Sequence, residues 1–176
     1  MEITERKKAE EQLRLKSITD DLTDLYNRRG FFTFSEKQWK SAKRFKRNMS
    51  LMYMDLNNMK SINDKLGHPS GDQALIDTAN VFRNTFRESD IIARMGGDEF
   101  AVLLTEITSV NDELIIFEHL RDNLKIQNEQ TSQSYILSLS IGASIFNPKY
   151  PITLDKMLKQ ADMLMYEDKK NKKNKA

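Results

Sequence analysis

The sequence contains no cysteine, and this absence excludes several kinds of site at once. Without thiols the chain has no disulfide framework, no thiolate metal site and no cysteine nucleophile. A reducing, cytoplasmic environment is therefore the default expectation for its location. Any chemistry in this chain must use oxygen and nitrogen groups.

Long apolar runs are absent as well. No stretch approaches the roughly 18 apolar residues that a membrane-spanning helix requires, and the N-terminus has no apolar signal-peptide core. We expect a soluble chain that makes no membrane contact itself, although a longer parent protein would be free to attach to a membrane.

Net charge of either sign is also small. The chain has 28 Lys and Arg against 26 Asp and Glu, a formal charge of +2, so no nucleic-acid partner is expected. Lysines crowd into residues 169–175, which we interpret as a basic, solvated C-terminal tail.

A length of 176 residues fits one domain with a core of useful size. Residues 1–19 are predicted to be an N-terminal linker or signalling helix, and residues 20–176 the folded domain. Leu15, Ile18, Leu22 and Leu25 follow coiled-coil spacing, although a helix that simply docks on the domain explains them equally well. A chain that opens inside a helix suggests a fragment of a longer protein.

The hydrophobic pattern predicts an α+β fold, with a mixed, largely antiparallel sheet covered by helices. The predicted helices cover residues 29–47, 59–66, 72 onward, 110–127 and 153–170. Strands are predicted over residues 50–56 and 135–145, and a hairpin over residues 91–104. The aromatic residues of the first of these helices, up to Phe45, are expected in the core, as is Leu164 of the last.

The strand over residues 135–145 alternates between apolar and small polar residues, which predicts one well-buried face. The face expected to be buried comprises Leu137, Leu139, Ile141 and Ile145. The opposite face comprises Ser138, Ser140, Gly142 and Ser144.

Two acids stand directly after the glycine pair of the hairpin, in the order Gly96-Gly97-Asp98-Glu99. Two glycines between apolar runs predict a tight two-residue turn, because glycine adopts positive φ without steric cost. Taken alone, the acids fit a solvated turn that discourages edge pairing as well as they fit a site.

Another acid, Asp55, ends the predicted strand over residues 50–56. If the two strands are neighbours, Asp55, Asp98 and Glu99 share one coordination sphere. Carboxylates at such short distances repel one another, so they need a cation between them. Ligation by oxygen alone fits Mg²⁺ or Mn²⁺, which often brings a substrate phosphate. Gly96 and Gly97 let a phosphate approach the backbone, so the residues indicate metal-assisted phosphoryl or nucleotidyl transfer.

Several separated motifs then agree in order and spacing. They are Asp21-Leu22-Thr23-Asp24-Leu25-Tyr26-Asn27-Arg28-Arg29, Asp55-Leu56-Asn57-Asn58-Met59-Lys60-Ser61-Ile62-Asn63-Asp64, Gly67-His68 with Gly71-Asp72, Gly96-Gly97-Asp98-Glu99-Phe100, Ser140-Ile141-Gly142, and Ala161-Asp162 with Tyr166 and Lys169. Over about residues 20–174 the sequence resembles the GGDEF domain family of diguanylate cyclases, which condense two GTP into cyclic di-GMP.

The sequence departs from the family pattern at four places. Asp24 stands where glycine is usual, Asn57 and Met59 replace Asp and Phe, and Lys172-Lys173-Asn174 replaces Gly-Arg-Asn. The last change puts one phosphate contact in doubt.

The resemblance implies a palm-like nucleotidyl cyclase architecture and a set of site residues. The implied catalytic residues are Asp55, Gly96, Gly97, Asp98 and Glu99. The implied ligands of two Mg²⁺ (or Mn²⁺) ions are Asp55, the Leu56 carbonyl, Asp98 and Glu99, with Glu99 also placed as the base at the 3′-hydroxyl. The residues implied for GTP are Asn57, Asn58, Met59, Lys60, Asn63, His68, Asp72, Lys169 and Lys173.

Within the GTP set, Asn63 and Asp72 are implied to read guanine, and the lysines to meet the triphosphate. His68 equally fits a structural turn residue, and Asn63 a helix cap. Arg87 and Asp90 match the family's inhibitory product site, with a solvated helix end as the alternative.

The resemblance also implies partners. An active homodimer, GTP, cyclic di-GMP and an N-terminal sensor of PAS type in the parent protein are expected. The competing interpretation is a non-catalytic module that binds GTP or cyclic di-GMP and regulates a partner.

Overall fold

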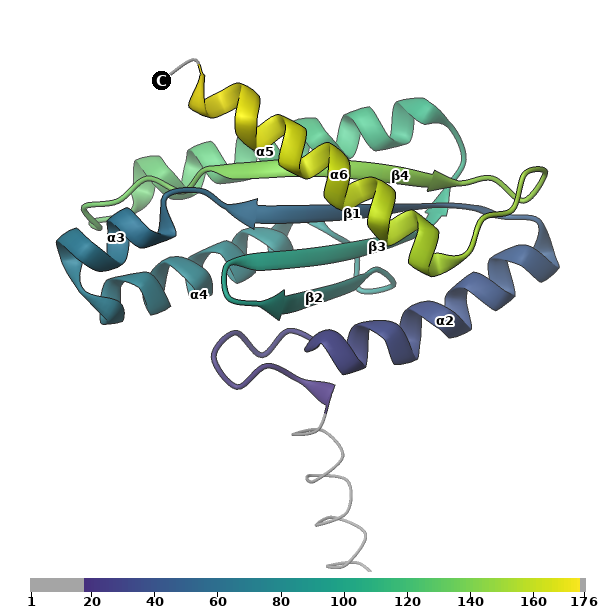
Figure 1. The fold of residues 1–176 in the computed structure, drawn as a ribbon, viewed down its shortest axis with the longest axis horizontal. Coiled ribbons are helices and arrows are strands. Elements are labelled where there is room, and N and C mark those ends of the chain that lie inside the picture. The colour runs from purple at the N-terminus through teal and green to yellow at the C-terminus, as the bar shows by residue number, and fades with distance from the viewer. Residues whose placement is uncertain (1–17, 175–176) are drawn as a thin grey trace, which may run out of the picture.

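The computed structural model describes residues 18–174 (Figure 1). The elements in chain order are α2 (Arg28–Phe45), β1 (Asn48–Leu56), α3 (Met59–Leu66), α4 (His68–Thr85), β2 (Ile91–Gly96), β3 (Glu99–Ile107), α5 (Val110–Gln130), β4 (Leu139–Phe146) and α6 (Leu154–Lys173). The helix predicted over the first residues lies outside the described part of the chain.

The four strands form one sheet in the order β2-β3-β1-β4, and every neighbouring pair is antiparallel. β1 occupies the interior of the sheet, and its residues from Met49 to Leu56 are all buried. A strand covered on both faces reads as a continuous apolar run, which is the pattern of this segment. The predicted α+β class is confirmed, with a sheet that is antiparallel throughout.

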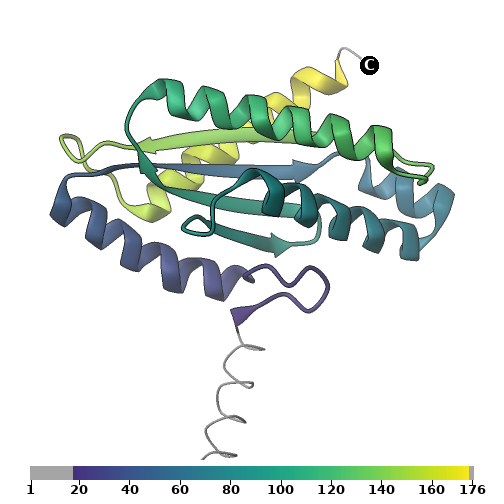
Figure 2. The same cartoon turned by 180° about the vertical axis from the view of Figure 1, so that it is seen from behind.

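Helices cover both faces of the sheet. In Figure 1, α6 crosses in front of β4 and β1, and in Figure 2 α4 and α5 lie in front. Two apolar clusters result. The cluster under α4 and α5 is built around Phe82, Phe100 and Leu120, and the cluster under α2 and α6 around Phe31, Met157 and Phe146.

Two predicted element starts are wrong. α4 begins at His68 rather than at residue 72, because Gly67 alone turns the chain (φ 87°) and Pro69 fits the first turn of a helix, where its missing N–H costs nothing. β4 begins at Leu139 rather than at residue 135.

The predicted faces of this strand are right only in part, because Leu137 and Leu139 are buried as expected (4% and 3% exposed) but the opposite face is buried as well. Ser140, Gly142 and Ser144 are buried under α6, whereas Ile145 is 42% exposed. Gly142 explains the close packing, because a Cβ there would overlap the backbone of α6 at Ala161 and Met165. Small residues admit the helix, while the apolar face toward α5 is left partly open by a hollow of about 830 Å³.

Three further expectations about apolar residues fail. Phe45 and Leu164 are exposed, at 63% and 47%, rather than in the core. Leu22 and Leu25 do not continue a coiled coil, because the chain turns sharply between Asp20 and Leu25. The Asp20 amide donates to the Leu25 carbonyl at 2.8 Å, and Asp24 adopts the left-handed conformation (φ 55°).

Both outer edges of the sheet are partly covered. On β4, Asp168 of α6 accepts a hydrogen bond from the Ile141 amide at 3.0 Å, and Lys172 donates to the Leu139 carbonyl at 2.7 Å. On β2, Tyr26 exchanges backbone hydrogen bonds with Ile92 (3.2 Å) and Arg94 (2.8 Å). These contacts satisfy edge groups that would otherwise be open to another strand.

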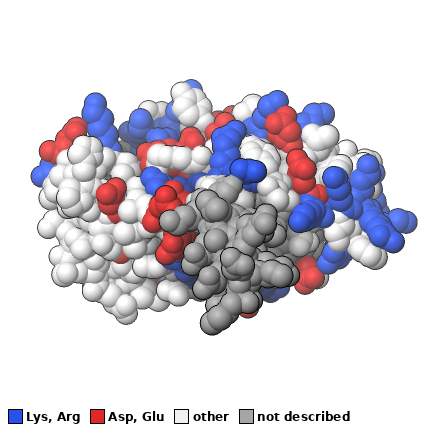
Figure 3. Space-filling model, turned by 90° about the horizontal axis from the view of Figure 1, so that it is seen from below, with Lys and Arg blue, Asp and Glu red and all other residues white. Residues whose placement is uncertain are grey.

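The small net charge hides an uneven distribution. Figure 3 shows Lys and Arg gathered at the right-hand end of the lower face, the end at which α2 finishes in Figure 1. The last turn of α2 carries Lys43 and Arg44, and Lys46 and Arg47 follow it. The acids of the hairpin lie at the other end of the sheet, where β1 ends and β3 begins.

Candidate active site

The acids at the ends of β1 and β3 meet through strand register. Asp55 lies directly opposite Glu99, and the Leu56 amide donates to the Asp98 carbonyl at 2.9 Å. Asp55 is only 4% exposed, whereas Asp98 and Glu99 are half-buried. The antiparallel pairing thus places three carboxylates from two distant stretches of sequence side by side.

The glycines before these acids shape the turn. Gly96 (φ 144°) is still paired with Glu99, so the two turn residues are Gly97 and Asp98 rather than the glycine pair. An irregularity between Arg94 and Gly96 shifts the register by one residue and accounts for this difference. A Cβ at Gly96 or Gly97 would meet nothing within 4 Å, so the outer side of the turn is open to a ligand.

Asp55 is held by Lys169 of α6, whose Nζ donates to Oδ1 at 2.7 Å. Burial raises the pKa of the Asp55 carboxyl, and the nearby Asp98 charge acts in the same direction, while Lys169 and Lys173 partly oppose both. The acids are therefore close enough to repel one another, and α6 supplies the counter-charge. Close packing of α6 on Gly142 helps to bring Lys169 to this position.

Glu99 has a different partner. The phenol of Tyr53 donates to Glu99 Oε2 at 3.1 Å, and Tyr53 is 5% exposed. Burial raises the pKa of Tyr53, and the Glu99 charge raises it further, so the phenol keeps its proton and remains a donor.

The oxygen donors fit a divalent cation. Asp55, Asp98, Glu99 and the Leu56 carbonyl supply hard oxygen ligands from two adjacent strand ends, the type that Mg²⁺ and Mn²⁺ prefer. Among residues 18–174, no three His, Asp or Glu side chains already stand in a metal-binding group. In this structure the positive charge beside Asp55 is that of Lys169.

A pocket of about 490 Å³ opens beside the acids, between α3, the start of α4 and the hairpin. Its lining includes predicted GTP residues from separate motifs, namely Met59, Lys60, Asn63, His68 and Asp72, together with Gly97 and Asp98 of the hairpin. A Cβ at Gly71 would overlap the side chain of Asn63, so this glycine lets the amide lie against the first turn of α4. Asp98 is therefore both one of the three acids and part of the lining of the pocket.

Other predicted residues lie outside this pocket. The Asn57 side chain faces β4, where it donates to Ser138 (3.1 Å) and accepts from Ser140 (2.8 Å). Asn58 adopts the left-handed conformation (φ 63°) before α3. From α6, Lys169 donates to Asp55, and the charge of Lys173 acts on the same carboxyl. For Asn63, the Gly67 amide bonds to its backbone carbonyl, so the end of α3 is closed by main chain.

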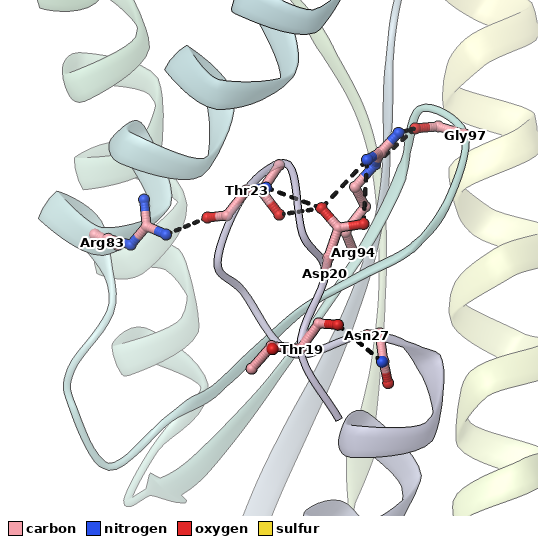
Figure 4. A network of polar contacts seen from close by, with 7 residues as sticks. All are labelled: Thr19, Asp20, Thr23, Asn27, Arg83, Arg94 and Gly97. Atoms are coloured by element: carbon pink, nitrogen blue, oxygen red, sulfur yellow. Dashed lines mark hydrogen bonds and ion pairs between the residues drawn. The ribbon is translucent and has the colours of Figure 1, made fainter. Parts of the chain in front are cut away.

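Arg94 and Asp20 form a network at this site that the sequence did not reveal (Figure 4). Arg94 donates to the Gly97 carbonyl from Nε (3.0 Å) and Nη2 (2.8 Å), and its Nη1 lies 3.2 Å from both Asp20 oxygens. Asp20 also accepts from the Thr23 amide and hydroxyl, and Arg83 donates to the Thr23 carbonyl. The turn before α2 is thereby tied to the hairpin.

Electrostatics favour this network. Burial alone would raise the pKa of Asp20, but the Thr23 hydrogen bonds and the Arg94 charge lower it overall. The signals in the sequence were weak: Asp20 and Thr23 have the spacing of an Asp capping a turn, and Arg94 is a charged residue inside an apolar strand.

Arg87 and Asp90 lie away from the pocket, between α4 and β2. Asp90 accepts hydrogen bonds from the Arg87 amide (3.0 Å) and the Thr105 amide (3.2 Å), and burial raises its pKa. Arg87 is exposed and borders two hollows of about 470 and 390 Å³. Asp90 thus closes the turn, while Arg87 remains accessible to a ligand.

The comparison with protein families is decisive on family membership. The model described as "Diguanylate cyclase, GGDEF domain" matches residues 17–175, nearly the whole chain. This chain belongs to the GGDEF domain family. The sequence motifs and the geometry at the end of β1 agree with that membership.

Relatives of this GGDEF domain include cyclases. "Probable diguanylate cyclase DgcC" of Escherichia coli K12 is 32% identical over 97% of the chain, and "Diguanylate cyclase TpbB" of Pseudomonas aeruginosa is 36% identical over 84%. The chain spans 46% of the length of DgcC and 34% of TpbB.

Solved structures share the fold. The GGDEF domain of TpbB from Pseudomonas aeruginosa superposes with a TM-score of 0.79 at 34% identity, covering 87% of this chain and 89% of that one. A microbial GGDEF domain described in an interaction with cyclic di-GMP has a TM-score of 0.74 at 26% identity, covering 88% of this chain and 94% of that one.

No helix within residues 18–174 is long and apolar enough to cross a membrane.

Proposed function

We propose that this GGDEF domain is a diguanylate cyclase, converting two GTP into cyclic di-GMP and two pyrophosphates. One observation supports this most directly: Asp55 and Glu99 face each other across β1 and β3, and Asp98 joins them to the pocket that contains Asn63 and Asp72. Family membership and relatives named as cyclases agree with the proposal.

In this proposal, the pocket binds the guanine. Asn63 and Asp72 supply an amide and a carboxylate, which together match the donor and acceptor groups of a guanine edge. Lys60, Lys169 and Lys173 hold the triphosphate as point charges, and the open turn at Gly96 and Gly97 lets phosphate oxygens approach the backbone. Asp72 then favours GTP over ATP.

The acids carry out the chemistry. Asp55, Asp98, Glu99 and the Leu56 carbonyl would hold divalent cations, which would neutralise the phosphates and increase the electrophilicity of the α-phosphorus. Glu99 faces the attacking 3′-hydroxyl and accepts its proton as the oxygen bonds to the α-phosphorus. The bond from that phosphorus to the bridging oxygen breaks, and pyrophosphate leaves.

The working species is a homodimer. The pocket beside Asp98, within residues 18–174, would hold one GTP, yet the product is a symmetric ring of two nucleotides. Two subunits therefore face one another, and each presents its 3′-hydroxyl to the α-phosphate held by the other.

Arg87 and Asp90 bind the product, and the bound product inhibits the enzyme by restraining this encounter between subunits. In the parent protein, an N-terminal sensor controls it.

The deciding experiment is to incubate the purified chain with GTP and Mg²⁺ and to measure cyclic di-GMP by chromatography. Product that depends on both GTP and the metal supports the proposal. A chain that binds GTP or cyclic di-GMP but makes no product at any protein concentration would instead be a regulatory binding module.

A further inference from the structure

Each of the two facing acids has its own hydrogen-bond donor, and the two donors differ in exposure to solvent. Lys169, which holds Asp55, lies on the outer helix α6 with its side chain 29% exposed. Tyr53, which holds Glu99, lies inside the sheet and is 5% exposed. A cation or phosphate can displace the lysine into solvent, but the tyrosine has no such exit.

Strand register explains why the Tyr53 ring fits in the sheet and why it points toward Glu99. Tyr53 is two residues before Asp55 on β1, so both side chains project from the same face of the sheet. Its partners in register are Ala101 on β3 and Gly142 on β4, the two neighbours with the smallest side chains available. The ring fits between them under α6 and reaches the diagonal neighbour, Glu99.

The hydrogen bond resolves a conflict at Glu99. Directly opposite stands Asp55, and like charges directly opposite each other on neighbouring strands are unfavourable. The Tyr53 phenol donates to Glu99 Oε2 at 3.1 Å, and within residues 18–174 no other hydrogen-bond donor is found for the Glu99 side chain. One oxygen is therefore fixed, and Oε1 is left for a cation or a hydroxyl.

We propose that Tyr53 is a positioning residue, which orients the Glu99 carboxylate through Oε2 so that Oε1 faces the reacting groups. This inference rests on the proposed cyclase function. It makes Tyr53 act on the rate of the chemical step rather than on GTP binding, since Tyr53 lies outside the pocket formed by α3 and α4.

The test is Tyr53→Phe, which removes one oxygen and keeps the ring. Tyr135 provides a matched control, because it is also buried (6% exposed) and donates to a carboxylate, Asp77, at 2.8 Å, away from the hairpin. Tyr135→Phe makes the same chemical change and leaves the site intact. Both variants are compared with the wild type in kcat, in KM for GTP and in melting temperature.

We expect Tyr53→Phe to lower kcat about 10- to 100-fold, the usual effect of removing a group that orients a metal-site ligand, with KM for GTP within about twofold. Tyr135→Phe should keep the wild-type kcat whatever it does to the melting temperature. Equal kcat in Tyr53→Phe and the wild type would overturn the inference, as would an equal loss in both variants.

A second measurement is independent of turnover. Titration with Mn²⁺ alone, followed by electron paramagnetic resonance, should show weaker binding in Tyr53→Phe than in Tyr135→Phe. If the wild type makes no product, the cyclase proposal fails, and a difference in Mn²⁺ affinity still supports the role of Tyr53 toward Glu99. Equal affinities in that case would reject it.

Discussion

Arg94 holds the carbonyl of Gly97 with two nitrogens, at 3.0 and 2.8 Å, while the same guanidinium contacts both oxygens of Asp20. One side chain therefore joins the turn between β2 and β3 to the segment that precedes α2. The pair is only partly exposed, with Arg94 at 16% and Asp20 at 22% of their side-chain surface.

Replacing Arg94 with Lys should lower both stability and activity. Lysine keeps the charge but lacks the planar fork that serves Gly97 and Asp20 together. We expect a loss of about 1–3 kcal/mol in the free energy of unfolding and a reduced kcat, measured by urea denaturation and by product formation. The control Lys159→Ala, which breaks an exposed ion pair with Asp155, should change neither. Unaltered stability in the Arg94 variant would show that the network has no role.

Asp98→Ala and Glu99→Ala should each abolish synthesis without unfolding the domain. Both side chains are half-buried at a strand end, so their removal creates no core cavity. Asp98→Ala also relieves the repulsion with Asp55, and its melting temperature should equal or exceed that of the wild type. Calorimetry and product assays check both points, with Asp155→Ala as an exposed acidic control. Turnover like that of the wild type in either variant would refute the mechanism.

Asp72→Ala should raise KM for GTP about 5- to 150-fold, because a buried guanine donor would lose its acceptor. ATP binding should change little, so the preference for GTP falls. Competition assays with both nucleotides measure the preference for GTP over ATP. The control is Asp122→Ala, which removes an exposed acid on α5. A uniform loss for ATP and GTP would mean that Asp72 does not read the base.

Specific activity should rise with protein concentration. In the proposed mechanism the product is made between two subunits, and we expect this chain by itself to be largely monomeric, so turnover per subunit should follow the fraction of dimer. Assays across a 100-fold dilution series, with sedimentation to measure the dimer, test this. Constant specific activity from a demonstrable monomer would contradict the homodimer.

Arg87→Ala should weaken inhibition by cyclic di-GMP while catalysis persists. Asp90 is unsuitable for this test, because it accepts two backbone hydrogen bonds and its loss would disturb the turn. We expect the inhibition constant to rise about fivefold or more, since loss of an arginine contact to guanine or phosphate removes a charge-assisted bond. Arg121→Ala, an exposed arginine on α5, is the control. Unchanged inhibition would eliminate Arg87 as a product ligand.

The sequence predicted elements and motifs well where local chemistry determines them. The strand that ends in Asp55 and the hairpin before Asp98 could be identified from apolar runs and glycines, and the residues around Asn63 and Asp72 from the family resemblance. The strand register in the structure places Asp55 opposite Glu99, as expected for neighbouring strands.

The errors arose where packing overrides periodicity. On β4 the apolar alternation correctly predicted that Leu139 is buried, but it missed that the opposite, serine-glycine face is buried as well, because its small residues let α6 approach. Tyr53 and Arg94 were missed for a related reason. Each looked like an ordinary strand residue, and its partner, Glu99 or Asp20, is fixed only by cross-strand geometry.

The covered edges of the sheet determine how two copies of this chain can associate. Joining two sheets along β4 would break the contacts of Asp168 and Lys172, and joining them along β2 would break those of Tyr26. Continuous intermolecular sheets are thus disfavoured at both ends. In the proposed homodimer the subunits therefore meet through side chains, an arrangement suited to a weak and reversible encounter in which the two hairpins approach and separate in each cycle.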